Sequence, residues 1–360
     1  MNGTARHYFA RGNTARGAHF LYGSAFQGLS KLVLLQGPSG TGKSTAIERL
    51  AYELIAQGQS IQLFHSPIQP NDLDALIATD LNIGVADANA CEGLPLTESA
   101  AIVRLDFGQA VNYDAIAADN GERIDALREQ LVDAYSKAYG TFAEALRIHD
   151  DWEKVYIASM NFQKADQVAK ELAQTLFAEP PGKNAVIRHL FFGAATPKGA
   201  VDHIQNLTAS LDKRIFIKGR PGSGKSTMLK YLARAAETSG FDAEVFHCGF
   251  DPNSLDMLIF PELRTAIFDS TAPHEYFPDR RGDVILDMYE RTMLPGTDER
   301  YADEIEPLRQ RYSQKMKEAT AFLGEAQKFD ARIKEFYTEA TDFSLVRTLQ
   351  TQLEREFIQS

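Results

Sequence analysis

The sequence lacks the features that define several protein classes. Two cysteines, Cys91 and Cys248, are too few for a disulfide framework and favour a reducing compartment, the cytoplasm. No run of 18 apolar residues occurs, so we expect no membrane-spanning helix, and the first residues show no apolar secretory segment. Basic residues (38) are fewer than acidic ones (49), and a net charge of −11 is not typical of a chain that wraps nucleic acid.

What is present is an ordinary globular composition and an internal repeat. The 360 residues are 44% apolar and 24% charged, enough for two domains with sizeable cores. The segment Lys31–Thr45 returns as Lys213–Thr227, and a later block returns at a shift of 181 instead of 182. We therefore expect two repeats, 1–182 and 183–360, with helical arms at about 122–178 and about 302–357.

Each repeat has the pattern of an α/β domain. Short apolar runs at 32–36, 61–65 and 83–87 alternate with helical patterns, which predicts a parallel sheet flanked by helices on both faces. Apolar residues at spacings of three and four follow, and a further helix is expected at 152–177 and at 333–357. The fold class predicted is a duplicated P-loop NTPase fold, each half with an added antiparallel helical hairpin.

The pattern G-x-x-x-x-G-K-[ST] occurs once in each repeat and is typical of triphosphate binding. Glycines let a strand-to-helix loop wrap its N–H groups around phosphates, and the following helix adds its positive end. Lys43 and Lys225 are expected to reach the terminal phosphates of ATP or GTP. The residues expected to contact the nucleotide are Gly37, Pro38, Ser39, Gly40, Thr41, Gly42, Lys43, Ser44 and Thr45, and in the second repeat Gly219, Arg220, Pro221, Gly222, Ser223, Gly224, Lys225, Ser226 and Thr227.

Magnesium needs oxygen ligands beside the phosphates. Ser44 and Ser226 supply hydroxyls in the two motifs. An aspartate closes an apolar run 44 residues after each lysine, and we expect Asp87 and Asp269 to hold Mg²⁺ through water.

The catalytic group is less clearly indicated. Many hydrolysing P-loop enzymes have a glutamate directly after the magnesium aspartate, but Ala88 and Ser270 stand there, which predicts slow hydrolysis. His247 and its counterpart His65 end a predicted strand and are either catalytic or simply hydrogen-bonded there. Asp74 and Asp256 are further candidates, with a helix cap as the alternative, and His274 or Glu275 is expected to contact a γ-phosphate or an acceptor.

Charge that develops on a transferred phosphoryl group is usually met by an arginine. Arg280 and Arg281 are the candidates in the second repeat, with Arg104 in the first, although a solvated surface pair is the alternative. The segment His149-Asp150-Asp151-Trp152 joins the two predicted arm helices and suggests a helix cap rather than a metal site. The apolar arms pack internally or offer a surface for a protein partner or self-association.

Several of these motifs together resemble a bacterial family of tandem P-loop ATPase-like proteins. The resemblance covers nearly the whole chain and is carried by YFARGNTARG, the two loops, DPNSLD, TAPH and HDDWEK. It implies two nucleotide-binding halves with no settled substrate. The first loop, GPSGTGKST, also looks like that of guanylate kinases and transporter ATPases, but no LSGGQ-type signature accompanies it.

Three functions fit these observations. The first is a slow Mg²⁺-dependent ATPase that couples nucleotide state to its helical arms. The second is a phosphotransferase acting on a nucleotide or small molecule, and the third is a nucleotide-dependent switch or scaffold with incidental turnover. Nothing in the sequence points to a membrane or nucleic-acid partner.

Overall fold

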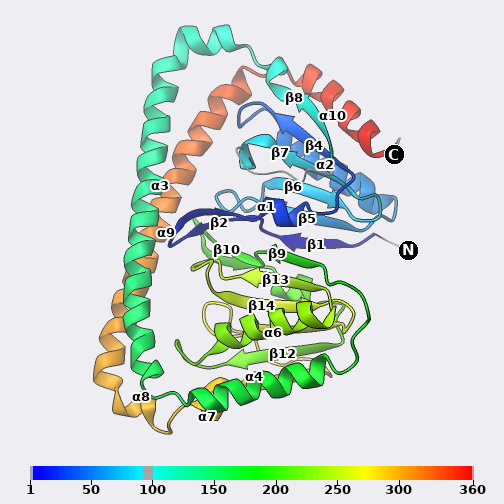
Figure 1. Ribbon diagram of the computed structural model, residues 1–360. Coiled ribbons are helices and arrows are strands. Elements are labelled where there is room, and N and C mark those ends of the chain that lie inside the picture. Colours follow the sequence, from blue (N-terminus) through cyan, green and yellow to red (C-terminus); the bar gives the residue numbers. More distant parts are fainter. Residues whose placement is uncertain (1–2, 92–99, 359–360) are drawn as a thin grey trace.

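Two six-stranded sheets lie end to end beside a pair of long helices (Figure 1). The computed structural model describes residues 3–91 and 100–358. The first sheet has the order β1-β5-β6-β7-β4-β8 and the second the corresponding order β9-β13-β14-β15-β12-β16. The chain is therefore an α/β protein in which each repeat builds its own sheet, and the two sheets have the same strand order.

The first repeat supplies eight strands and four α-helices among its described residues. Its strands are β1 (Ala5–Tyr8), β2 (Arg11–Thr14), β3 (Gly17–Phe20), β4 (Lys31–Gln36), β5 (Ile61–His65), β6 (Leu73–Ala78), β7 (Ile83–Asp87) and β8 (Ala101–Asp106). Its helices are α1 (Tyr22–Ala25), α2 (Lys43–Ala56), α3 (Tyr113–Ile157) and α4 (Phe162–Leu176), with short 3-10 turns η1 (Ala88–Ala90) and η2 (Phe107–Ala110).

The second repeat follows the same plan. Its strands are β9 (Ile187–Leu190), β10 (Gly193–Thr196), β11 (Gly199–Asp202), β12 (Lys213–Lys218), β13 (Ala243–His247), β14 (Leu255–Phe260), β15 (Thr265–Asp269) and β16 (Asp283–Asp287). Its helices are α5 (Ile204–Leu207), α6 (Lys225–Ser239), α7 (Met288–Thr292), α8 (Thr297–Arg300), α9 (Ala302–Glu339) and α10 (Phe343–Ile358).

The prediction of an all-parallel sheet is wrong. Strand β6, which the sequence analysis missed, runs antiparallel to both β5 and β7, and β14 does the same in the second sheet. Only residues 66–72 separate β5 from β6, too few for the crossover that a parallel connection needs. Both sheets are therefore mixed.

The predicted helical hairpin within each repeat is also wrong. Helix α3 packs antiparallel along α9 of the other repeat, with Ile124 and Leu127 against Ile333 and Tyr337 near one end. Helix α3 continues through Trp152, so the expected second arm helix begins ten residues late, at Phe162. At 1.5 Å per residue, α3 spans about 68 Å, which carries the chain from the first sheet to the second.

The terminal helices of the repeats are consequently exchanged. Helix α4 packs with α6 on the second sheet, where Ala169 and Leu176 join its core. Helix α10 packs with α2 on the first sheet through Val346 and Phe357. The other face of each sheet is turned toward the other repeat, and the two faces share one hydrophobic core. This shared core takes the place of the second helical layer expected on each sheet.

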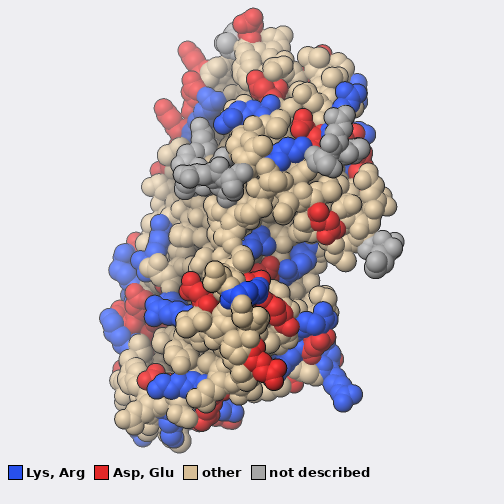
Figure 2. All heavy atoms as spheres, turned by 45° about the vertical axis from the view of Figure 1, so that its right-hand side comes forward, with Lys and Arg blue, Asp and Glu red and all other residues tan. Residues whose placement is uncertain are grey.

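Surface and helix properties agree with the composition. Figure 2 shows lysines and arginines interspersed with acidic side chains, without a continuous basic field on this face. None of the helices in the described part of the chain combines the length and the apolar character needed to cross a bilayer.

Candidate functional site

Each glycine motif forms the loop between a central strand and a helix. The first loop leaves β4 and enters α2 at Lys43, and the second leaves β12 and enters α6 at Lys225. The three glycines of each loop all have positive φ, between 72° and 152°. This conformation is strained for residues with a side chain and turns successive N–H groups toward one side.

In the first loop, the lysine folds back over its own backbone. Its Nζ donates to the carbonyls of Gly37 and Pro38, the latter at 2.8 Å, and lies 3.5 Å from Oδ2 of Asp87 at the end of β7. The Lys43 side chain is only 3% exposed. Burial lowers the pKa of Lys43 and raises that of Asp87, because each charged group has lost part of its contact with water.

The second loop repeats this arrangement. Lys225 Nζ donates to the carbonyl of Arg220 at 2.9 Å and lies 3.6 Å from Oδ2 of Asp269. The other oxygen, Oδ1, accepts hydrogen bonds from the backbone N–H and the hydroxyl of Thr271. The structure thus brings together each predicted lysine and aspartate pair.

Both motif serines face the start of the antiparallel strand. Ser44 Oγ accepts a hydrogen bond from Leu73 N at 2.8 Å, and Ser226 Oγ accepts one from Leu255 N at 3.0 Å. The residue after each leucine is an aspartate. Asp74 and Asp256 lie within β6 and β14, so the alternative of a helix cap is wrong for both.

These two aspartates have different partners. Arg11 forms an ion pair with Asp74, with its Nε 2.6 Å from Oδ2, and Tyr22 donates to the same oxygen. Gly193 stands at the position of Arg11 in the second repeat. Asp256 therefore has no such arginine, and burial followed by the nearby charge of Asp269 raises its pKa to about 6.

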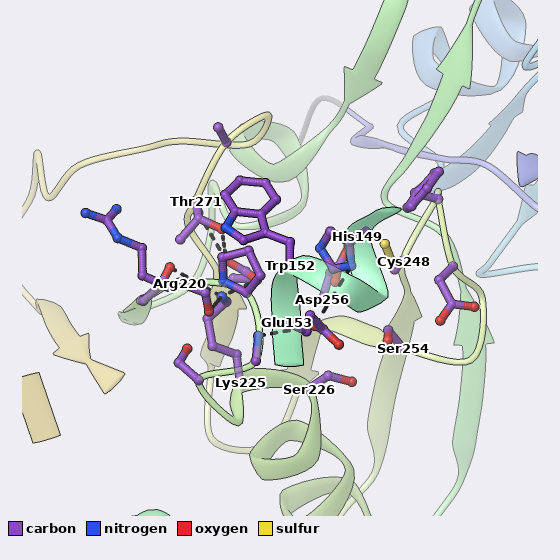
Figure 3. A pocket seen from close by; sticks show the side chains of 18 of the residues that line it. His149, Trp152, Glu153, Arg220, Lys225, Ser226, Cys248, Ser254, Asp256 and Thr271 are labelled. Carbon is purple, nitrogen blue, oxygen red and sulfur yellow. Dashed lines mark hydrogen bonds and ion pairs between the residues drawn. The ribbon is translucent and has the colours of Figure 1, made fainter. Parts of the chain in front are cut away.

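A cavity of about 1650 Å³ opens in front of the second loop. It is lined by the loop itself and by Asp256, Asp269 and His274, together with residues of α3, α4 and α9 (Figure 3). Helix α3 comes from the first repeat, so both repeats build this one site. Arg220 and Arg309 bring guanidinium groups to its walls, and Arg220 pairs with Asp298.

The long helices touch both loops directly. At the second loop, Glu153 Oε1 of α3 accepts a hydrogen bond from Gly222 N at 3.2 Å. At the first loop, Thr338 of α9 donates to the carbonyl of Gly40 at 3.1 Å. A Cβ on Gly222 would lie 2.7 Å from the carbonyl oxygen of Glu153. Glycine is therefore required there by the close approach of α3 as well as by the positive φ of the loop.

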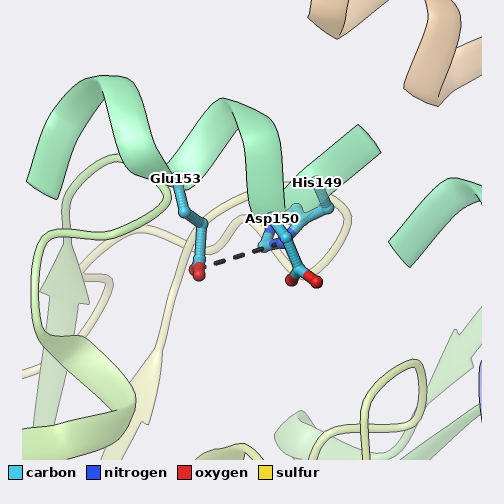
Figure 4. A group of neighbouring side chains, drawn as sticks. All are labelled: His149, Asp150 and Glu153. Carbon is cyan, nitrogen blue, oxygen red and sulfur yellow. Dashed lines mark ion pairs between the residues drawn. The ribbon is translucent and has the colours of Figure 1, made fainter. Parts of the chain in front are cut away.

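The HDDW segment lies inside α3, so the predicted helix cap is wrong. His149, Asp150 and Glu153 occupy one turn of α3 and line the cavity, with His149 Nδ1 4.0 Å from Glu153 Oε1 (Figure 4). The ligand atoms of the three side chains lie within 4.8 Å of one another. Only the fold brings this turn of α3 to the second loop.

Other predicted catalytic residues lie elsewhere. His247 donates through Nδ1 to the carbonyl of Pro252, and its Nε2 meets His189 at 2.8 Å, so both ring nitrogens are engaged within the second repeat. The guanidinium of Arg280 donates to backbone carbonyls of 208 and 209, and Arg281 is exposed. Among the described residues that line the cavity, His274 is present and these three are not.

His274 is held in place by an acidic partner. Its Nδ1 lies 2.8 Å from Oδ2 of Asp202, whose other oxygen accepts from Tyr276. The candidates that sequence reasoning missed are Trp152 and Glu153, since nothing in the first repeat alone places α3 on the second loop. Comparison with known proteins adds no identification, because no family model, curated protein or solved structure matches the chain.

Proposed function

We propose that the chain binds Mg²⁺ with a nucleoside triphosphate, ATP or GTP, at its two glycine loops and hydrolyses it slowly at the second. One observation carries the proposal. In both repeats a lysine begins a helix, behind three glycines of positive φ, within 3.6 Å of the aspartate that ends the neighbouring strand. Backbone N–H groups, an ammonium and a helix N-terminus together suit a polyphosphate.

The second loop is the better equipped for turnover. Asp256, Asp269 and the hydroxyl of Ser226 offer the oxygen ligands that Mg²⁺ prefers. A divalent cation there would offset the burial and the repulsion from Asp269 that together raise the pKa of Asp256. In the first repeat the guanidinium of Arg11 already neutralises the corresponding carboxylate, so we assign that loop to binding.

Hydrolysis is expected to be slow because the usual base is absent from its place. Ser270 follows Asp269, and its hydroxyl donates to the carbonyl of Tyr276 while accepting from the same residue's N–H. It is therefore not available to activate water. Magnesium, when bound, supplies charge neutralisation at the phosphates, while Lys225 and the loop N–H groups orient them.

Nucleotide occupancy is expected to move the long helices. The carboxylate of Glu153 sits on Gly222 N, one of the N–H groups that a phosphate oxygen would use. A phosphate must displace this like charge, which changes the contact between α3 and the loop. Helix α3 packs along α9, and α9 touches the first loop, so the pair of long helices connects the two sites.

The volume of the cavity favours a second candidate function. Pockets for one small ligand usually measure about 300–1000 Å³, and the 1650 Å³ cavity exceeds this range. Phosphoryl transfer to an acceptor other than water is therefore the alternative to hydrolysis.

The test is phosphate release from ATP and GTP by the full chain, Lys43→Ala, Lys225→Ala and the double variant. We expect Lys225→Ala to remove turnover, with a rate loss of at least about 100-fold, and Lys43→Ala to retain most of it. Unchanged release by Lys225→Ala would contradict the proposal. Release that needs an added hydroxyl compound would identify the phosphotransferase.

A further inference from the structure

Four aromatic rings form a wall on the arm side of the cavity. His149 and Trp152 come from α3, Tyr312 from α9, and Phe250 from the segment after β13. Their centroids are linked at 5.6 Å (His149–Tyr312), 5.8 Å (Phe250–Tyr312), 6.1 Å (Trp152–Tyr312), 6.2 Å (His149–Trp152) and 6.3 Å (His149–Phe250). Rings at such spacings offer faces and edges to a further planar ring.

The wall lies next to the second glycine loop. Trp152 directly precedes Glu153, whose carboxylate lies on Gly222 N. His149 is one turn earlier on α3, and its Nδ1 lies 4.0 Å from Oε1 of Glu153. Lys225 is the residue expected to reach the β- and γ-phosphates. If a nucleotide binds as proposed, a ligand against the wall would lie beside its phosphates.

One polar group in the wall has no well-formed hydrogen bond. Trp152 Nε1 is buried and has no hydrogen-bond partner of good geometry among the described residues. The neighbouring Tyr156 hydroxyl interacts with it but donates its own proton to Asp298. A buried N–H without a well-placed acceptor is unfavourable. A ligand with an acceptor atom would remove this cost.

The first repeat shows that the fold does not require these rings. At the same shifts of 181 and 182, Asp330 replaces His149, Ile333 replaces Trp152, Leu131 replaces Tyr312 and Ile68 replaces Phe250. There Ile68 is buried with Ala134 and Ala326, with Leu131 packed against them. The same framework thus carries Ile68, Leu131 and Ile333 where the second repeat presents Phe250, Tyr312 and Trp152 to a cavity.

We propose that the aromatic wall binds a second ligand, a hydroxyl-bearing molecule with a planar heteroaromatic ring, beside the terminal phosphate of the nucleotide. The ring packs against Trp152 and Tyr312, and a ring or substituent acceptor atom takes the indole N–H. The position of the phosphates in this proposal rests on the proposed function. The second ligand would be the molecule whose hydroxyl accepts the phosphoryl group.

Trp152 is the single tryptophan of the chain, so its fluorescence reports on the wall alone. The probe is adenosine, titrated into the full chain with Mg²⁺ and a saturating non-hydrolysable ATP analogue. We expect saturable quenching whose midpoint does not shift when the analogue concentration is raised. Calorimetry in parallel reports binding of the analogue.

Tyr312→Leu and Phe250→Ile place the residues of the first repeat in the wall and keep Trp152. Each is expected to weaken adenosine binding by at least about tenfold, equal to 1.4 kcal/mol, and to leave binding of the analogue within about twofold. Tyr52→Leu, an exposed tyrosine of α2, is the control and should change neither.

The outcomes are separable. Adenosine that fails to quench, or that competes with a bound analogue, overturns the second-ligand site and assigns the wall to the nucleotide's own base or to packing. An analogue that does not bind contradicts the proposed function instead, and the adenosine titration without the analogue then decides whether the wall holds a ring.

Discussion

The backbones of Phe9 and Phe191 exchange two hydrogen bonds, at 3.0 and 3.1 Å. These residues occupy the same position in the two repeats, separated by 182. A residue that pairs reciprocally with its own counterpart must lie on a local two-fold axis, as in an isologous dimer interface. The chain is thus built like a dimer made covalent, and each half borrows the other's long helix to complete its loop.

The contact of Glu153 with the second loop predicts a gain in affinity. Glu153→Gln removes the negative charge that competes with a phosphate for Gly222 N. We expect nucleotide to bind about fivefold more tightly, equivalent to about 1 kcal/mol. Calorimetry checks this, with Glu129→Gln on the exposed face of α3 as the control. Weaker binding by Glu153→Gln would mean that the carboxylate assists the nucleotide.

The close approach of α3 predicts that Gly222 is constrained in two ways. An alanine there is strained by φ of 72° and its Cβ would meet the carbonyl of Glu153. Gly199 also has positive φ, at 94°, but open space around its Cβ, so Gly199→Ala isolates the backbone strain. We expect Gly199→Ala to lower the free energy of unfolding by about 1 kcal/mol and Gly222→Ala by more.

Urea unfolding of the two glycine variants measures this difference. Equal losses would show that α3 yields without cost at Gly222. A larger loss at Gly222, together with weakened nucleotide binding, would show that the arm is seated on the loop in the folded protein.

The different partners of Asp74 and Asp256 predict opposite consequences for the same substitution. Asp74→Asn leaves Arg11 largely buried without its carboxylate, and we expect the free energy of unfolding to fall by about 3 kcal/mol. Asp256→Asn removes a carboxylate whose ionisation is already disfavoured by burial, so stability should hold.

Activity should follow the reverse order. We expect Asp256→Asn to raise the Mg²⁺ concentration needed for half-maximal turnover, because one oxygen ligand is lost. Asp74→Asn should leave that requirement unchanged at temperatures where it is folded. If Mg²⁺ dependence were the same in both variants and the parent chain, Asp256 would have no part in metal binding.

The histidines between the repeats predict loss of stability in mild acid. His65 donates through Nδ1 to the carbonyl of Pro70, and its Nε2 meets His7 at 2.8 Å. Burial lowers the pKa of His65 to about 4 and that of His203, whose ring lies 4.8 Å away, to about 3. The unfolded chain binds protons near pH 6.5, before the folded chain does.

Stability is therefore fully present above pH 6.5 and falls as the pH is lowered toward 4. We expect a loss on the order of 2 kcal/mol between pH 7.5 and pH 5. His65→Asn keeps a donor near Pro70 without a titrating ring, and its unfolding free energy should depend less steeply on pH. An unchanged slope would assign the acid sensitivity to other groups.

The sequence predicts features that depend on neighbouring residues, but not those that depend on contacts between distant segments. The loops, the lysine that begins each helix and the aspartate at the end of β7 or β15 follow from local patterns. Strand β6 was missed because six consecutive buried residues carry no alternation, so their period does not distinguish helix from strand.

Exchange of the arms was also outside the reach of local patterns. The apolar seam of α3 predicts a helical partner but not which one, since the arm helices of both repeats carry compatible seams. Trp152 and Glu153 gain their place in the site only from this choice. The difference between Asp74 and Asp256 likewise depends on Arg11, which lies in β2, far from both in sequence.

The most direct test of the central claim is equilibrium dialysis of a radiolabelled, non-hydrolysable ATP or GTP analogue with Mg²⁺. The parent chain, Lys43→Ala, Lys225→Ala and the double variant are compared after circular dichroism confirms that each is folded. We predict saturable binding by the parent chain, loss of the site at the second loop in Lys225→Ala, and none in the double variant. Retention of the analogue by the folded double variant, or no retention by the parent chain at millimolar concentration, would contradict the account.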